Sequence, residues 1–239
     1  MILLKMPVKV FESKITETKN FNDDVKCIGF YLPEGFNFKP GQYLSLSTFV
    51  DGKKLRKPYS IVSLPGEKFA EFCIKLVENG KASHFIKNLK EGNVIELFGP
   101  AGKFFINENS KNKDLIFISA GTGISSFISM ISYLLENEFE NKIILLKGFK
   151  DENEILYEEE FLGLKKRYKN FEFYNILSQP NNNGFENKGY VQDFLNKYVP
   201  QNFQGDFYIC GLNEMIDSVV KKLKEKGVTE KKIFFEKYN

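Results

Sequence analysis

The chain has 239 residues, of which 42% are apolar, and a formal net charge of +3. This length accommodates one large domain or two small ones, and the apolar share supports a packed core, so a generally disordered chain is excluded. The charge is too small and too dispersed to indicate nucleic-acid binding. Apolar runs such as 115–120 are far too short to span a bilayer and no signal-peptide segment is recognisable, so we expect a cytoplasmic protein.

The cysteine and histidine content limits which redox centres are possible. The chain contains three cysteines, Cys27, Cys73 and Cys210, in no C-x-x-C pattern, and a single histidine, His84. An ordinary iron–sulfur cluster requires about four thiolates, and one histidine with three widely separated cysteines does not form the closely spaced ligand pattern of a His/Cys zinc site. We therefore expect no metal site, and any redox centre would be an organic cofactor.

The first hundred residues read as short strands rich in β-branched and aromatic residues, separated by turn signals such as Pro40-Gly41 and Gly99-Pro100. The predicted strands are 8–18, 25–31, 43–48, 59–63, 71–77 and 94–98, with one helix at 83–88. Many short strands at near-regular spacing are typical of an antiparallel barrel or sandwich. The polar segment 107–113 is predicted to be a structureless linker, so the expected domains are 1–106 and 114–239.

Beyond the linker, strands and helices alternate. We expect strands at 115–120, 142–148, 171–177, 206–210 and 232–236, and helices at 124–135, 153–167, 191–198 and 214–226. Continuously apolar strands that alternate with helices predict a parallel sheet covered on both faces. Ligands of such sheets bind at the carboxyl ends of the strands, where Gly121-Thr122-Gly123, Ser178 and Cys210-Gly211 all fall.

Gly121-Thr122-Gly123 joins a predicted strand to a predicted helix. Glycines permit a tight turn and a close approach of the backbone to a phosphate, and the helix N-terminus adds N–H groups and a positive dipole end. The full dinucleotide fingerprint has a third glycine where Ser126 stands. A plain tight turn without a ligand therefore stays open as an alternative on this motif alone.

Six motifs in order resemble the ferredoxin–NAD(P)H reductase family of flavoproteins over nearly the whole chain. They are Lys57-Pro58-Tyr59-Ser60, Gly80-Lys81-Ala82-Ser83, Gly99-Pro100-Ala101-Gly102-Lys103-Phe104, Gly121-Thr122-Gly123-Ile124, Cys210-Gly211 and Phe235-Glu236-Lys237-Tyr238. The resemblance implies an antiparallel β-barrel that binds FAD, followed by a parallel-sheet, Rossmann-like domain that binds NADH or NADPH.

In that family the first motif is Arg-x-Tyr-Ser/Thr, in which the arginine holds the FAD pyrophosphate, the tyrosine packs on the flavin and the hydroxyl lies near flavin N5. Tyr59 and Ser60 match, Pro58 lies between, and Lys57 occupies the arginine position. A lysine keeps the charge but loses the bidentate fork. Arg56 comes one residue earlier and on a strand would point away from Tyr59, so Lys57 is favoured and Arg56 stays open.

The resemblance also assigns the segment 74–83. Ile74, Lys75 and Leu76 would pass the flavin edge, and Gly80, Lys81, Ala82 and Ser83 would hold the FAD pyrophosphate with backbone N–H groups at a helix start. The alternative is that Ser83 is an ordinary helix N-cap.

Three residues near the carboxyl end would complete the reacting centre. The resemblance places Cys210, followed by Gly211, beside the nicotinamide C4, and Glu236 near the reacting rings, so the expected catalytic residues are Ser60, Cys210 and Glu236. Tyr238 would stack on the flavin, or would pack at a domain interface. Cys27 and Cys73 are interpreted as core residues.

The implied activity is hydride transfer between NAD(P)H and flavin, followed by electron transfer to a separate acceptor: a ferredoxin, a flavodoxin, an oxygenase component or a free flavin. An electron-relay subunit of a larger redox complex is the alternative. Lys150 and Ser178 could hold a 2′-phosphate, but no arginine is available there, so NADH is slightly favoured over NADPH. The basic excess suits an acidic partner, or is simply a solvated surface.

Overall fold

The computed structural model describes residues 8–50, 52–182 and 184–238. The chain divides into two compact units, one up to Phe105 and one from Ile106, which are described separately. None of the helices in the described ranges has the length and apolarity that a membrane crossing requires.

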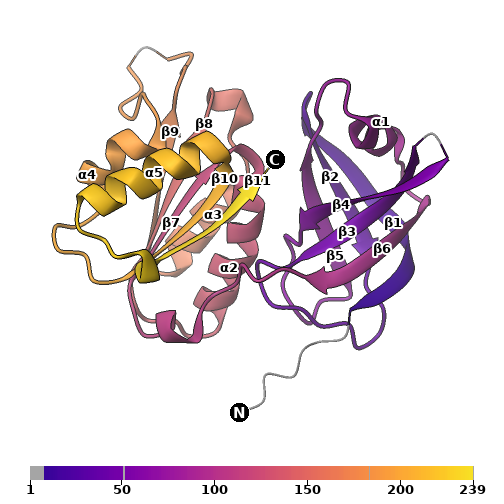
Figure 1. Cartoon of the computed structure of the whole chain (residues 1–239), viewed down its shortest axis with the longest axis horizontal. Helices are drawn as coiled ribbons and strands as arrows, with labels where there is room; N and C mark the ends of the chain where they lie inside the picture. Colours follow the sequence, from indigo (N-terminus) through magenta and orange to yellow (C-terminus); the bar gives the residue numbers. More distant parts are fainter. Residues whose placement is uncertain (1–7, 51, 183, 239) are drawn as a thin grey trace. The chain divides into compact units, whose positions relative to one another are not determined.

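The first unit is a curled antiparallel sheet with one short helix (Figure 1). Its elements are β1 (Lys9–Asn22), β2 (Val25–Tyr31), β3 (Tyr43–Val50), β4 (Lys53–Ser60), β5 (Phe69–Lys75), α1 (Lys81–Asn88) and β6 (Val94–Ala101). The strand order is β4-β3-β6-β1-β2-β5. Alternate residues such as Ile28, Leu46 and Phe72 point into one core, and α1 adds Ile86 to it, so one face of each strand is apolar.

The second unit is a parallel five-stranded sheet with helices on both faces (Figure 1). Its strands are β7 (Leu115–Ala120), β8 (Ile143–Phe149), β9 (Phe171–Leu177), β10 (Asp206–Leu212) and β11 (Ile233–Tyr238), in the order β11-β10-β7-β8-β9. Its helices are α2 (Ile124–Glu136), α3 (Glu158–Arg167), α4 (Leu195–Tyr198) and α5 (Asn213–Glu225). Short 3-10 turns occupy Glu108–Ser110, Gly121–Gly123, Glu152–Glu154, Val191–Phe194 and Glu230–Lys232.

The two faces of the parallel sheet have separate apolar layers. Ile116 and Ile118 of β7 pack with Leu195 of α4 and Val219 of α5 on one face. On the other face, Phe117 lies edge-on to Phe127 of α2, with 5.0 Å between the ring centroids. Burial on both sides explains why these strands are continuous apolar runs in the sequence. The predicted antiparallel barrel followed by a parallel sheet is confirmed, with the barrel present as a curled six-stranded sheet.

Several predicted elements need correction. Lys57–Ser60 lies inside β4, which begins at Lys53, and not at the start of a strand at 59–63. The helix predicted at 153–167 is a 3-10 turn at Glu152–Glu154 and then α3, because Tyr157 adopts a left-handed conformation with φ +56°. β10 and β11 each extend two residues beyond their predicted ends, at 210 and 236.

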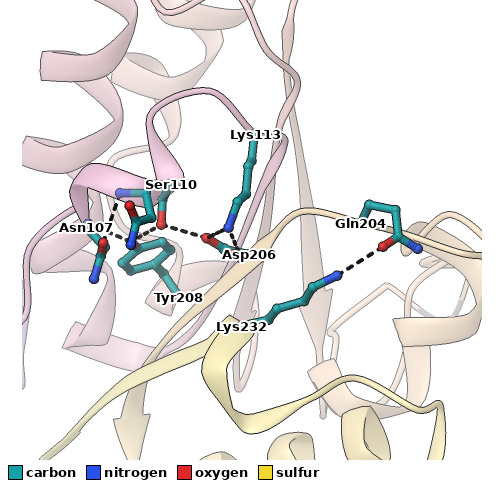
Figure 2. A network of polar contacts seen from close by, with 8 residues as sticks. Asn107, Ser110, Lys113, Gln204, Asp206, Tyr208 and Lys232 are labelled. Carbon is teal, nitrogen blue, oxygen red and sulfur yellow. Dashed lines mark hydrogen bonds and ion pairs between the residues drawn. The ribbon is translucent and has the colours of Figure 1, made fainter.

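The segment 107–113 is not structureless. It contains the 3-10 turn Glu108–Ser110 and is bound to β10 by a buried polar network (Figure 2). The Ser110 hydroxyl donates to Asp206 Oδ2 (2.7 Å) and accepts from the Tyr208 hydroxyl (2.9 Å), and Lys113 Nζ lies 3.0 Å from Asp206 Oδ2. The Asn107 N–H donates to the Tyr208 hydroxyl at 2.9 Å. These contacts make the segment part of the second unit.

Candidate functional site

The turn after β7 and the end of β10 meet at the carboxyl edge of the parallel sheet. In the sheet, β7 has β8 on one side and β10 on the other. The chain continues from β7 to β8 and β9 on the first side and then crosses to β10 and β11 on the second, so the strand order reverses between β7 and β10. Open α/β sheets bind their ligands at such a topological switch point. The predicted residues Gly121, Thr122, Gly123, Cys210 and Gly211 flank this position.

Glycine is required here by close packing of the backbone. A Cβ atom on Gly123 would overlap the carbonyl group of Cys210, and one on Gly211 would lie 3.2 Å from the backbone N and O of Ala120. Gly121 is different, because its φ is +53° and its Cβ position is open. No side chain caps the start of α2, and no acidic residue lies in its first turn. The turn therefore leaves the positive end of α2 available to an anion.

Cys210, Ser126 and Tyr238 form a small polar cluster beside this turn. Cys210 is fully buried, and its Sγ lies 3.9 Å from Ser126 Oγ, which lies 3.3 Å from the Tyr238 hydroxyl. Burial first, and then the nearby Glu236 carboxylate, raise the pKa of the Cys210 thiol to about 12. The thiol therefore stays protonated at neutral pH, as a packing and positioning group and not as a nucleophile.

Glu236 is the register partner of Cys210 on β11. Burial raises the pKa of its carboxyl group to about 7. A carboxyl group with this pKa exchanges a proton near neutral pH, which suits a role in proton transfer.

The ends of β8 and β9 are joined through their loops. Ser178 donates its N–H to the Phe149 carbonyl at 3.0 Å, and Gln179 donates to the Lys150 carbonyl at 2.7 Å. The Glu152 carboxylate accepts from the N–H groups of Asn181 (2.8 Å) and Asn182 (3.2 Å), which lowers its pKa. Sequence reasoning missed Glu152; its position next to Asp151, just after the second parallel strand, was the available signal.

In the first unit, β4 separates Arg56 from Tyr59. Tyr59 packs against the core with its ring centroid 5.7 Å from that of Phe72, and burial raises its pKa to about 12. Lys57 lies on the same face of the strand by alternation and is exposed. Arg56 lies on the opposite face, over the Phe98 ring at 4.6 Å and 3.6 Å from Glu96. Pro58 is exposed and Ser60 is buried.

Most of the segment from Leu76 to Ser83 lines a cavity of about 980 Å³ in the first unit. Leu76, Val77, Gly80, Lys81 and Ser83 all face it. Ile74 and Ala82 are instead in the core, and Lys75 is exposed. The cavity also has Phe49, with 71% of its surface exposed, which sequence reasoning missed because nothing marked this hairpin residue as part of a site.

Ser83 is not the N-cap of α1. The N-cap position is Gly80, which has no capping side chain, and the Ser83 hydroxyl accepts the Val77 N–H at 2.8 Å. The hydroxyl thus fixes the turn, and no acidic residue lies in the first turn of α1. The start of this helix offers backbone N–H groups together with the Lys81 charge.

The fold, the turn at Gly80–Ser83 and the turn at Gly121–Gly123 match a protein class that joins a flavin-binding domain to a nicotinamide-nucleotide-binding domain. A family described as the oxidoreductase FAD-binding domain matches residues 12–106, and one described as the oxidoreductase NAD-binding domain matches residues 117–221. The chain belongs to the ferredoxin–NAD(P)H reductase family of flavoproteins.

Two similar proteins carry the names of phenol-oxidising systems, a phenol 2-monooxygenase and a phenol hydroxylase. The chain is 33% identical to the reductase component DmpP of phenol 2-monooxygenase from Pseudomonas sp. (strain CF600) and 30% identical to the phenol hydroxylase P5 protein from Acinetobacter pittii (strain PHEA-2). Each alignment covers 97% of this chain and 66% of the relative, so the chain spans slightly less than two thirds of these relatives' length.

Solved structures share the fold over nearly the whole chain. A ferredoxin NADP+ reductase from Neisseria gonorrhoeae with bound FAD and NADP has a TM-score of 0.84 at 20% identity, covering 96% of this chain and 98% of that one. The ferredoxin-NADP+ reductase from Plasmodium falciparum has a TM-score of 0.82 at 27% identity, covering 96% of each chain.

The residues present fit both cofactors. For FAD, the first unit has a basic residue on the Tyr59 face of β4, an uncapped helix start at Gly80 and a cavity of suitable size beside it. For the nicotinamide nucleotide, the second unit has the close-packed glycine turn at the switch point.

Proposed function

We propose that this protein is an FAD-dependent NAD(P)H oxidoreductase that passes electrons to a separate acceptor. The observation that carries the proposal is the meeting of the Gly121–Gly123 turn with Cys210 and Gly211 at the switch point, in a chain whose first unit has a flavin-type site. The bound flavin would take a hydride from the nicotinamide and release electrons singly or in pairs. The protein would act mainly by positioning.

Most of the predicted residues have a proposed task. Lys57 and the N–H groups at Gly80–Ser83 hold the FAD pyrophosphate, Tyr59 packs on the flavin, and Ile74, Lys75 and Leu76 pass its edge. Ser60 places its hydroxyl near the flavin. Gly121, Thr122 and Gly123 take the nucleotide phosphates, while Cys210 and Gly211 align the nicotinamide. Residues 1–106 would form the flavin domain and residues 114–239 the body of the nucleotide domain, to which the segment 107–113 is bound through Asp206 and Tyr208.

Lys57 is the better of the two basic candidates. Arg56 is engaged with Phe98 and Glu96 on the face of β4 that Tyr59 does not share, and Lys57 has its face of the strand in common with Tyr59. Replacing Lys57 with methionine should weaken FAD binding about tenfold or more, because a charged pyrophosphate contact is lost. The Arg56→Met variant is the matched control, measured by fluorescence of released flavin.

Glu236 would hold or release a proton beside the reacting centre, because its carboxyl group titrates near neutral pH. Tyr238, bonded to Ser126, would stack on the flavin. Removal of residues 238–239 should then alter the flavin absorption spectrum and the nicotinamide affinity, and unchanged spectra and kinetics would rule this role out.

NADH is the favoured nucleotide. The loop after β8 presents Asp151 and Glu152, and a carboxylate in this region disfavours a 2′-phosphate. Lys150 is the competing basic group. A ratio of kcat/KM values that favours NADPH tenfold or more would overturn the preference.

The test of the activity is anaerobic titration of the purified, FAD-loaded chain with NADH and NADPH, followed by a panel of acceptors. Rapid bleaching of the flavin and reduction of a ferredoxin, a flavodoxin, an oxygenase component or free flavin is expected. Slow bleaching by both nucleotides would instead indicate an electron-relay subunit. A colourless protein that takes up no FAD would refute both. We place the reaction in the cytoplasm.

A further inference from the structure

Cys27 of β2 and Cys73 of β5 are register partners across an antiparallel strand pair. Both carry reduced thiols, and they are 4% and 6% exposed. Their neighbours along each strand, including Ile28, Phe72 and Ile74, point into the core of the first unit, so the two thiols share the opposite face of the sheet. Neither cysteine belongs to the flavin or nucleotide machinery proposed above.

The hydrogen bonds at the two ends of this strand pair establish which kind of pair the cysteines form. The Leu76 N–H donates to the Asp24 carbonyl at 2.6 Å, and the Leu32 N–H donates to the Lys68 carbonyl at 2.9 Å. The register between these bonds is unbroken. Hydrogen-bonded and non-hydrogen-bonded pairs alternate residue by residue along an antiparallel ladder. The bonded pairs Asp24/Leu76 and Leu32/Lys68 are each an odd number of residues along the strand from the cysteine pair.

Cys27 and Cys73 therefore form a non-hydrogen-bonded pair, the type in which the side chains lie closer together. The Cα atoms of such a pair are about 4.5 Å apart. Disulfides have Cα separations of about 4.4–6.8 Å, so this pair can be linked without moving the strands far. Two cysteines in sequence-distant strands acquire this relation only through the fold.

We propose that Cys27 and Cys73 are a reversible disulfide site that links β2 to β5 when the protein is exposed to a peroxide. One thiolate attacks the peroxide O–O bond and becomes a sulfenic acid, and hydroxide is released. The second thiol then attacks that sulfur, the S–S bond forms and the sulfenic oxygen leaves as water. In total, two thiols and one hydrogen peroxide give one disulfide and two waters, and a thiol reductant reverses the link.

The position of the pair gives a small oxidant a route to it. β5 is the last strand of the sheet order, so no strand of the described residues follows it on its outer edge, where the Val62 N–H donates to the Glu71 carbonyl at 3.0 Å. On the face of the thiols, the side chains around them include exposed Lys19, opposite Cys27 on β1, and exposed Lys75, two residues beyond Cys73. The residues next to the two thiols on this face are therefore in contact with solvent.

The link would act on the segment that carries the candidate flavin turn. β5 ends at Lys75 and continues into Leu76 and the turn at Gly80–Ser83. A covalent connection to β2 would restrain this strand in the folded state and shorten the free chain in the unfolded state. The proposal is independent of the proposed function, because it requires only the fold of the first unit.

The experiment counts thiols in the purified, flavin-loaded full chain. The protein is reduced, freed of reductant, treated with hydrogen peroxide, then denatured in N-ethylmaleimide and weighed by intact mass spectrometry. The untreated chain should carry three labels, one for each cysteine, and the oxidised chain one, on Cys210. Peptide mapping should find Cys27 joined to Cys73, and dithiothreitol should restore three labels.

The single variants Cys27→Ser and Cys73→Ser are the matched controls, and each should keep two labels after the same treatment. The linked wild-type chain should also melt several degrees above its reduced form, whereas the melting of the double variant should not respond to peroxide. Three labels after oxidation, a link to Cys210, or sulfinic acid without a link would each overturn the proposal.

Discussion

Gly121 and Gly123 lie in one turn but differ in what a side chain would meet. A Cβ on Gly121 has open space, and only its φ of +53° opposes a substitution, so Gly121→Ala should cost about 1 kcal/mol. A Cβ on Gly123 would overlap the Cys210 carbonyl, so Gly123→Ala should cost about 3 kcal/mol and separate the turn from β10. Urea unfolding of both variants measures this; equal costs would contradict the close packing.

Glu236 should make the stability of the protein depend on pH near neutrality. Burial raises its pKa to about 7 in the folded protein, from 4.5. The folded state therefore binds a proton that the unfolded state releases between these pH values. The contribution of Glu236 to the free energy of unfolding is fully present below about pH 4.5. It is lost as the pH rises through 7 and amounts to at most about 3 kcal/mol.

The Glu236→Gln variant isolates this effect, because glutamine does not titrate. Urea unfolding at pH 5, 7 and 8.5 should show a smaller loss of stability with rising pH in the variant than in the wild type. The two proteins should then differ in the slope of stability against pH and not only in its level. Parallel pH profiles would mean that Glu236 is ionised in the folded protein throughout this range.

For single residues, the sequence predicts the direction of a side chain better than its hydrogen-bond partners. Period-2 alternation is enough to separate Arg56 from Tyr59 on β4, and the structure places Arg56 over Phe98 on the other face. The bond from the Val77 N–H to Ser83 was not predictable, because a serine next to a helix start resembles an N-cap. The contacts of Glu152 with Asn181 and Asn182 join two loops that are distant in sequence.

Among the elements, β8 and α3 are connected by a buried ion pair. Lys147 of β8 is fully buried between the rings of Phe161 and Phe173, with its Nζ 2.8 Å from Glu158 at the start of α3. Burial lowers the pKa of the lysine, and Glu158 opposes that shift. An uncompensated buried charge costs more than an apolar replacement of similar volume.

The two halves of this pair should therefore respond unequally to mutation. Glu158→Ala leaves the Lys147 ammonium buried without its carboxylate and should cost about 3 kcal/mol. Lys147→Met places a flexible apolar chain between the two rings and should cost about 1 kcal/mol, while Glu158 keeps its hydrogen bonds from Asn175 and its contact with water. Chemical denaturation compares them, and an equal or larger cost for Lys147→Met would contradict this account.

The ion pair of Lys147 and Glu158 lies where the prediction of secondary structure from the sequence fails. Strands β2 and β9 were predicted to the residue, because turn signals border continuous runs rich in apolar residues. The helix predicted at 153–167 is correct only from Glu158, where α3 begins. Tyr157 adopts φ +56°, immediately before the Glu158 carboxylate that Lys147 binds. A lysine buried by tertiary packing leaves no local signal.

For the whole molecule, the change from antiparallel strands to alternating strands and helices predicts two architectures from sequence alone. The segment between them was harder to assign, because Asn-Glu-Asn-Ser-Lys-Asn-Lys has the composition of a linker. Its contacts are with Asp206 and Tyr208, nearly a hundred residues later, and only the folded sheet brings these together. Composition describes local preference and contains no information on such a distant partner.

The network of Ser110, Lys113, Asp206 and Tyr208 should determine where the second unit can be cut. Asp206 is 1% exposed and accepts from Ser110 and Lys113, so removing its donors leaves a carboxylate buried and unpaired. A fragment of residues 106–239 keeps these donors, whereas a fragment of residues 114–239 lacks them. The longer fragment should be more stable by about 3 kcal/mol or more, and the shorter one should unfold at lower urea concentration.

The variant Asp206→Ala separates the two explanations for such a difference. In the short fragment it should restore stability relative to the unaltered short fragment, because the unpaired charge is removed, and in the long fragment it should destabilise because Ser110 and Lys113 lose their acceptor. Opposite signs in the two fragments are the expected result of the urea titrations. Destabilisation of similar size in both would mean that segment 106–113 contributes by covering the sheet and not by pairing Asp206.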